Sequence, residues 1–268
     1  SIVKKLFADK AFAGEVNLSG VNSINWARIL VQIIYYFSAF YQIKDLPSGK
    51  LSFSVPTGNF GDAYAGYLAK KMGLPIDKII VATNKNDILD RVFKTGIYRS
   101  NNVTKTLSPS MDIQVASNFE RLLFDLLNSD TKEVGKLMKH FSNKGHFKLE
   151  KKMLSLISRD FDSGAVTDKD TISTINHFFH ERQIILCPHS AIGVKVGKTF
   201  VDLGETVVSL GTAHPAKFKE TVESALNMKI QIPSALKGVM EKKERVKVIP
   251  SSKEKLTDEI RKSYLMMD

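Results

Sequence analysis

The first half of the chain alternates short apolar runs with longer stretches of helical spacing. The segment "KLSFSVPT" (50–57) alternates apolar and polar residues and predicts a strand. The segment "GDAYAGYLAKKMG" (61–73) has helical spacing and stops at Gly73, with Pro75 just beyond, as a helix closed by glycine does. The continuous apolar run in "DKIIVATN" (77–84) is typical of a strand buried inside a parallel sheet. Together the three segments predict one βαβ unit.

A long apolar helix is predicted before this unit. The segment "SINWARILVQIIYYFSAFYQI" (23–43) carries apolar residues nearly all round the helix, which is typical of a helix that is mostly buried. Asn22 or Ser23 would cap its first turn. The apolar run is broken by Gln32 and Ser38 and is too short to span a bilayer.

Further helices and strands follow the βαβ unit. The segment 85–96 predicts a helix that is capped by Asn84 or Asn86 and closed by Gly96. More helices are predicted in 118–147, 150–161, 168–183 and 253–268, a strand followed by a helix in 183–200, and a strand ending at a Gly-Thr turn in 205–218. This alternation predicts an α/β fold, with an open, twisted, mostly parallel sheet and helices on both faces.

Composition and charge narrow the class of partner. Hydrophobic residues make up 43% and charged residues 25%, as in ordinary soluble globular proteins. The net charge of +11 admits nucleic acid, an anionic membrane or small anionic ligands. The basic residues are dispersed, however, and no RNA-binding motif, zinc-finger spacing or arginine-rich arm accompanies them. We therefore expect a solvated basic surface, with no nucleic-acid and no membrane partner.

The single cysteine bears on the compartment. Cys187 lies in "IILCPHSA", where an inert core thiol is the expected role, and one cysteine cannot form an internal disulfide. No N-terminal segment resembles a signal peptide. We expect a cytoplasmic protein.

The loop between the first predicted strand and its helix is suited to an anion. Gly58 and Gly61 let the backbone approach a ligand closely, and the following helix offers unpaired N–H groups and a partial positive charge. The loop is not a P-loop, because Asp62-Ala63 stands where a Lys-Ser/Thr pair is needed. A structural turn, with Asp62 as a helix cap, explains the same residues.

A second segment favours the ligand interpretation. Thr212 follows Gly211 at the end of the predicted strand in "VVSLGTAHPAKF". Ligands in open α/β sheets lie beyond the carboxyl ends of the strands, so Thr212 and the glycine loop could face the same crevice. Taken alone, Thr212 would be a capping hydroxyl in a turn.

Several motifs together resemble a known family. In this order, "NSINWARI", "PTGNFGDAYAGYLAKKMGLP", "ATNKNDILDR", "LSPSMDI", "SNFER", "PHSAIGV" and "LGTAHPAKF" are similar to motifs of threonine synthases of the long bacterial and fungal type. These lyases use pyridoxal 5'-phosphate and are related to the tryptophan synthase β chain. The resemblance implies conversion of O-phosphohomoserine and water to threonine and phosphate, the last step of threonine biosynthesis.

The resemblance also implies roles for individual residues. The pyridine nitrogen of the cofactor would meet the hydroxyl of Thr212, and the cofactor phosphate would be held by Gly58, Asn59, Phe60, Gly61 and Asp62. For the substrate phosphate we advance a hypothesis of our own, contact with Asn25 and Arg28, since arginine suits a phosphate geometrically.

No catalytic residue is predicted within this chain. The family's Schiff-base lysine follows a Phe in a "P-T-x-x-F-K-D"-like run, and that run is absent here. Three lysines do follow a Phe without the flanking residues, and surface roles are expected for them: Lys94, Lys148 and Lys219. The chain therefore resembles a C-terminal portion, whose partner is the missing N-terminal half of the same enzyme. By itself we expect it to be inactive.

The histidines offer weaker candidates. His177 and His180 are three apart on a predicted helix, but no third ligand lies nearby in the sequence, so no metal site is predicted. His189 and His214 lie in the family-like motifs, and structural roles are expected for both.

The domain organisation follows from the resemblance. Residues 1–20 would be the end of a smaller, largely absent N-terminal domain. Residues 21–268 would form the α/β domain that binds the cofactor phosphate, with a helical insertion around 118–183. Two other functions stay open: a threonine synthase-like phospho-lyase, and a non-catalytic binding module made by truncation. A nucleic-acid-binding protein is supported by net charge alone.

Overall fold

The structure of the protein, a computed structural model, describes residues 2–20, 22–43, 46, 51–240 and 242–265. The chain divides into two compact units. The large unit is Ser23–Ile232, and the small unit combines Ser1–Asn22 with Pro233–Asp268. The C-terminal tail, which we expected to belong to the α/β domain, groups in the structure with the N-terminal helices.

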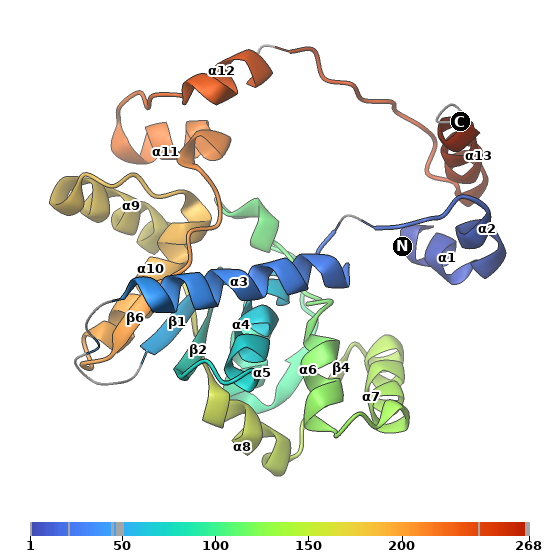
Figure 1. Ribbon diagram of the computed structural model, residues 1–268, viewed down its shortest axis with the longest axis horizontal. Helices are drawn as coiled ribbons and strands as arrows, with labels where there is room; N and C mark the ends of the chain where they lie inside the picture. The colour runs from blue at the N-terminus through green and yellow to red at the C-terminus, as the bar shows by residue number, and fades with distance from the viewer. Residues whose placement is uncertain (1, 21, 44–45, 47–50, 241, 266–268) are drawn as a thin grey trace. The chain divides into compact units, whose positions relative to one another are not determined.

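Four parallel strands form the sheet of the large unit, in the order β5-β2-β1-β6 (Figure 1). Their bounds are β1 Leu51–Pro56, β2 Ile76–Thr83, β5 Phe161–Ala165 and β6 Thr206–Ser209. β1 is buried along its whole length, and β6 at the edge is half-buried. The predicted βαβ unit is confirmed as β1, helix α4 (Gly61–Lys71) and β2.

The remaining elements of the large unit are mostly helices. They are α3 Trp26–Gln42, α5 Ile88–Thr95, η1 Pro109–Met111, α6 Phe119–Leu126, α7 Thr131–Lys144, α8 Lys151–Asp160, α9 Asp168–Arg182, α10 Pro188–Val201, η2 Pro215–Phe218 and α11 Lys219–Leu226. A separate antiparallel pair joins β3 (Ile97–Arg99) to β4 (His146–Lys148). Over the described part of the chain, no helix combines the length and the apolar character that crossing a membrane requires.

Helices cover both faces of the sheet, because side chains along a strand point alternately to its two faces. Ile79 and Val81 of β2 pack into the main core, which also contains the buried side chains of α3, α4 and α5. Ile80 and Ala82 pack into a second core with Ile192 of α10. The expected α/β class, a parallel sheet between helical layers, is confirmed.

Three local expectations are wrong. Residues 183–187 form no strand; they run without a ladder partner to Cys187, which caps α10. The N-cap of α5 is Asp87, so neither Asn84 nor Asn86 caps that helix. The segment 118–183 is not purely helical, because it contains β4 and the sheet strand β5.

Helix α3 differs from its expectation in two ways. Its cap is Asn25, whose side-chain oxygen accepts a hydrogen bond from the N–H of Ala27, and not Asn22 or Ser23. It is also not mostly buried. Its buried side chains are those of one face only, Ile29, Ile33 and Tyr36, because only this face meets the core of the unit.

A close contact fixes the packing of α3 on α4 (Figure 1). A Cβ atom built on Gly66 would lie 2.6 Å from Cε1 of Tyr36, so only glycine admits the tyrosine ring at this position. The hydroxyl of Tyr36 then donates a hydrogen bond to the backbone oxygen of Asp62 at 2.8 Å. The contact therefore joins the core to the first turn of α4.

The small unit contains α1 Ile2–Ala8, α2 Lys10–Glu15, α12 Ser234–Met240 and α13 Lys253–Leu265. Leu6 and Phe12 form a small core with Ile260 and Tyr264 of α13. The ion pair of Arg261 with Glu15 also joins the two ends of the chain, at 2.6 Å. The predicted terminal helix is confirmed.

Replacing Gly66 tests the packing of α3 on α4. We expect Gly66→Ala to lower the free energy of unfolding by about 1–3 kcal/mol, because the added methyl group meets the ring of Tyr36. Gly135→Ala is the matched control in α7, where an added Cβ meets nothing within 4 Å. The control should stabilise the protein by about 0.5–1 kcal/mol. Urea unfolding measures both, and equal effects would contradict this packing.

Candidate functional site

A cavity of about 450 Å³ lies at the carboxyl ends of β1 and β6. The described residues that line it are Ser23, Arg28, Gln32, Tyr35, Pro56, Thr57, Gly58, Asn59, Phe60, Gly61, Asp62, Leu210, Gly211 and Thr212. The glycine loop and Thr212 are more than 140 residues apart in sequence and nevertheless face one space. The crevice expected at the ends of these two strands is present.

The backbone at Phe60 makes the sharp turn into α4. Phe60 has φ 65° and ψ 8°, in the left-handed region, which is costly for a bulky residue. Its ring is buried and meets the rings of Phe93, Phe119 and Phe161 at centroid distances of 5.7–6.0 Å. This aromatic packing stabilises a conformation that the residue would not adopt by itself.

The first turn of α4 presents hydrogen-bond donors to the cavity lining. The first N–H groups of any helix have no partner within the helix. In the described part of the chain, the N–H groups of Gly61, Asp62 and Ala63 have no acceptor. The helix dipole adds partial positive charge at the same place. The turn therefore has the free donors and the partial positive charge that an anion-binding helix N-terminus requires.

Two contacts hold the glycine loop in position. A Cβ on Gly58 would lie 2.9 Å from the backbone oxygen of Ser110, so the loop passes the 108–112 segment where only glycine fits. The fully buried Asn118 donates from its side chain to the backbone oxygens of Asn59 (3.1 Å) and Ser23 (2.9 Å). Asn118 thus joins the loop to the residues that lead into α3.

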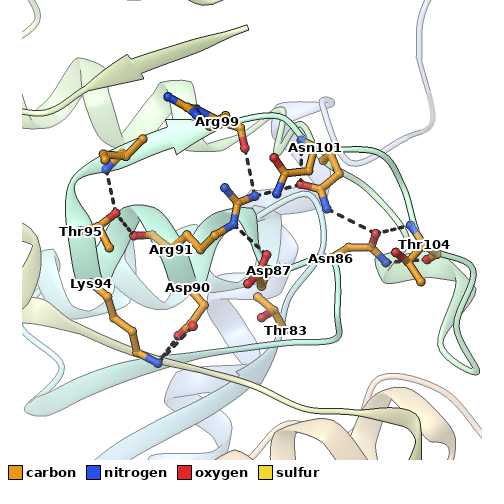
Figure 2. A network of polar contacts seen from close by, with 12 residues as sticks. Thr83, Asn86, Asp87, Asp90, Arg91, Lys94, Thr95, Arg99, Asn101 and Thr104 are labelled. Atoms are coloured by element: carbon orange, nitrogen blue, oxygen red, sulfur yellow. Dashed lines mark hydrogen bonds and ion pairs between the residues drawn. The ribbon is translucent and has the colours of Figure 1, made fainter.

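The segment that contacts Gly58 is itself held by a buried polar network. The carboxylate of Asp112 accepts hydrogen bonds from the side chains of Asn84 (2.8 Å) and Asn86 (3.0 Å) and from the backbone of Thr106 (2.9 Å). Figure 2 shows Asn86 exchanging two hydrogen bonds with the backbone of Thr104, both 2.8 Å long. The residues that follow β2 thereby hold the 108–112 segment against the glycine loop.

Asp62 brings a carboxyl group to the cavity. Burial raises the pKa of Asp62 to about 6, and the hydrogen bond from the Tyr36 hydroxyl, 3.3 Å from the carboxylate, lowers it only in part. The carboxylate does not cap α4, whose N-cap position is Phe60. The Asp62 carboxyl is therefore protonated more readily than an exposed aspartate, but it is still mostly ionised at neutral pH.

Thr212 belongs to a small hydrogen-bonded group at the other side of the cavity. The hydroxyl of Ser190 accepts from the N–H of Thr212 at 3.1 Å and lies 3.4 Å from the Thr212 hydroxyl. The buried thiol of Cys187 lies 3.7 Å from the same hydroxyl. Burial raises the pKa of Cys187, but hydrogen bonds from His189, Ser190 and Thr212 outweigh it and lower the pKa to about 6. Cys187 is thus a polar partner at the site as well as a buried residue.

The two residues predicted to meet a substrate phosphate separate in the structure. Arg28 lines the cavity from α3, whereas Asn25 is absent from its described lining and caps the helix. No lysine stands among the described lining residues. Of the lysines that follow a Phe, Lys94 pairs with Asp90 at 2.8 Å.

The histidines have structural partners. His189 accepts from the N–H of Ser110 at 3.2 Å, and His214 accepts from the N–H of Ala216 at 3.1 Å, capping η2. His177 and His180 lie on α9. The described residues contain no group of three or more His, Cys, Asp or Glu side chains that could hold a metal ion.

A larger cavity of about 710 Å³ lies elsewhere, between the start of α3 and helices α6 and α7. Trp26, Arg121 and Asp125 are among its lining residues, and none of the predicted site residues is. Because the predicted site residues line the smaller cavity and not this one, we take the smaller cavity as the candidate site.

Sequence reasoning missed the residues that hold the site together. The side chains of Tyr36 and Asn118 are buried and donate hydrogen bonds to residues 26 or more positions away. Asn118 stands in "SNFER", which served only as a mark of resemblance. The clustered amides and hydroxyls of "ATNKND" and "LSPSMD" were the available signal for the network, but the two asparagines were predicted as helix caps and "LSPSMD" served only for the resemblance.

Comparison with known proteins agrees with the resemblance of the motifs. A family profile described as "Threonine synthase, C-terminal" matches residues 190–260. Threonine synthase from Pseudomonas aeruginosa is 46% identical over 252 residues, which cover 93% of this chain and 54% of that protein. The chain spans about half the length of the curated relatives it matches.

Solved structures give the same result. The crystal structure of PLP-bound threonine synthase from Brucella melitensis superposes with a TM-score of 0.88 at 44% identity, covering 97% of this chain and 56% of that one. Yeast threonine synthase superposes with a TM-score of 0.87 at 39% identity, covering 100% of this chain and 57% of that one. The expected similarity, to a C-terminal portion of threonine synthases, is confirmed.

The raised pKa of Asp62 predicts how stability changes with pH. The folded state favours the protonated carboxyl, so its contribution is complete below the unfolded pKa of about 3.8 and is lost as pH rises through about 6. We expect Asp62→Asn to stabilise the protein relative to wild type by about 1–3 kcal/mol at pH 7.5. The difference between the two proteins should shrink at pH 4.5.

Urea unfolding at the two pH values measures this difference. The exposed Asp202 on the same unit serves as the control, and Asp202→Asn should show no such change between pH values. A difference between wild type and Asp62→Asn that stays constant with pH would contradict the assignment.

Proposed function

We propose that this chain is the C-terminal portion of a threonine synthase and that its cavity holds pyridoxal phosphate. The observation that carries the proposal is the meeting of the glycine loop, the first turn of α4 and Thr212 around one cavity of about 450 Å³. A 44% identical threonine synthase was solved with the cofactor bound. The complete enzyme would convert O-phosphohomoserine and water to threonine and phosphate.

The loop fits the phosphate of this cofactor. Gly58 has no room for a side chain, and the N–H groups of Gly61, Asp62 and Ala63 are available as donors within the described structure. Asn59 would add its backbone and side chain from the cavity lining. Phe60 would act through its backbone alone, because its ring is in the core. Asp62 would contribute its N–H group.

Thr212 would face the pyridine nitrogen. Bound pyridoxal phosphate supplies an electron sink for carbanion chemistry on the amino-acid substrate. A neutral hydroxyl at the nitrogen does not hold it protonated as a carboxylate would. The sink would then be weaker than in enzymes with an aspartate there, which favours elimination and replacement. Ser190 and Cys187 would hold the Thr212 hydroxyl in place.

Arg28 would receive the phosphate of the substrate. It lines the same cavity as the glycine loop, from α3, and its planar guanidinium suits a phosphate. Asn25 would act indirectly, by capping the helix that carries Arg28. Proton transfer at the substrate would need the lysine supplied by the remaining portion of the enzyme.

The fit of the loop to a phosphate can be tested on this chain alone. Pyridoxine 5'-phosphate lacks the aldehyde and cannot react with surface lysines, so it reports on the non-covalent site. We expect it to bind at least about tenfold more tightly than pyridoxine, because only the phosphate meets the first turn of α4. Gly58→Ala should remove this preference, since its methyl group meets the Ser110 oxygen.

Equilibrium dialysis measures the two ligands, with Gly135→Ala as the control that keeps the preference. Equal affinity of the wild type for pyridoxine and its phosphate would refute a phosphate site at this loop.

The role of Arg28 requires the complete enzyme. A joined protein can be made by placing this chain behind the N-terminal portion of the Pseudomonas aeruginosa threonine synthase, the part of that relative that this chain does not match. In the joined protein we expect Arg28→Gln to raise KM for O-phosphohomoserine by about 10–100-fold, the loss of a charge-assisted hydrogen bond.

Steady-state kinetics measure this KM, with Arg99→Gln as the control on β3. A KM unchanged by Arg28→Gln would remove Arg28 from the substrate site.

A further inference from the structure

The side of α3 that faces away from the core is apolar and exposed. Five large residues make up what we call the outer face of α3: Leu30, Val31, Ile34, Tyr35 and Tyr41. Their side chains are 51–77% exposed. A helix on a protein surface is expected to be polar on this side.

The pattern along the helix makes this face continuous. The buried residues Ile29, Ile33 and Tyr36 lie on one side, and the rows Leu30–Ile34 and Val31–Tyr35, each spaced i, i+4, lie on the other sides. Contiguous exposed apolar surface of this kind marks an interaction site in soluble proteins. Although α3 is apolar nearly all round, only one of its faces is buried in the described part of the chain.

The outer face adjoins the candidate site. Tyr35 belongs to the outer face and also lines the cavity, next to Gln32 and Arg28 of the same helix. A partner that closes the cavity at Tyr35 would therefore also contact the outer face of α3. The described lining contains no lysine, so the closing part would also have to bring that group.

We propose that the outer face of α3 is the docking surface for the N-terminal portion that threonine synthases have and that this chain does not span. The inference rests on the proposed function. Two facts favour this occupant. The match with the Brucella enzyme covers 97% of this chain but only 56% of that enzyme. In addition, α3 borders the cavity that the rest of the enzyme would complete. The same helix would then hold Arg28 toward the substrate and Leu30 and Ile34 toward the N-terminal portion.

Cysteine labelling tests this surface without relying on activity. Cys187 is buried and is the only cysteine of the chain, so an introduced cysteine reacts above a low background. Leu30→Cys is compared with Leu203→Cys, which is also exposed and precedes β6 at the end of the sheet away from the cavity. Each variant is labelled with a maleimide in this chain alone and in the joined protein, whose N-terminal portion has its own cysteines replaced by serine.

We expect Leu30→Cys to react at least about tenfold more slowly in the joined protein than in the chain alone, and Leu203→Cys to react equally in both. Equal reaction of Leu30→Cys in both proteins would overturn the proposal. Protection of Leu30→Cys in the chain alone that grows with protein concentration would also overturn it, because the occupant would then be a second copy of the chain.

Thermal unfolding gives a second test, which can be used if the joined protein folds too poorly for labelling. Leu30→Glu should leave the Tm of the chain alone unchanged and should lower that of the joined protein, whereas Leu203→Glu should change neither. A fall of Tm in the chain alone would place Leu30 in its own core and refute a docking role.

Failure of the proposed function is seen separately, by borohydride reduction of the joined protein with pyridoxal phosphate and measurement of its mass. If Leu30→Cys is protected in the joined protein but no cofactor adduct forms, the docking proposal stands and the proposed function is rejected. If one adduct forms but Leu30→Cys is not protected, the proposed function stands and the docking proposal is rejected.

Discussion

The left-handed turn at Phe60 is the constraint on which the rest of the site depends. Because φ is 65° at this residue, the chain leaves β1 and enters α4 within a few residues. The strain is offset by an aromatic ring packed among three others, so the core of the unit determines the shape of the loop. A loop held in this way needs no reorganisation when an anion arrives, which is the condition for strong binding by backbone donors.

The contact of Tyr36 with Gly66 links that loop to α3. One tyrosine ring fills the space above a glycine in α4, and its hydroxyl reaches the first turn of the same helix. The position of α3, and hence of Arg28 at the cavity, is therefore set by the same packing that places the anion site.

The exposed apolar side of α3 indicates that the site depends on a further portion of the enzyme. The cavity has walls from the glycine loop, α3 and the end of β6, and no lysine among its described lining residues. Pyridoxal phosphate chemistry needs a lysine to form the covalent link and to move protons. A portion that covers the apolar face of α3 and supplies the lysine would complete the cavity, which accounts for the inactivity expected of this chain alone.

The sequence by itself determined the elements that have a local physical cause. The βαβ unit follows from the alternation in 50–57, the glycine closing α4 and the apolar run of β2, and the anion loop follows from two glycines before a helix. The motifs also carried the family resemblance. Only the tertiary structure decided which distant residues meet: Thr212 with the glycine loop, Asn118 with Asn59, and Asn84 with Asp112. It also decided that α3 buries a single face. Such contacts depend on the chain folding back on itself, and neither the spacing nor the propensity of neighbouring residues determines where distant segments meet.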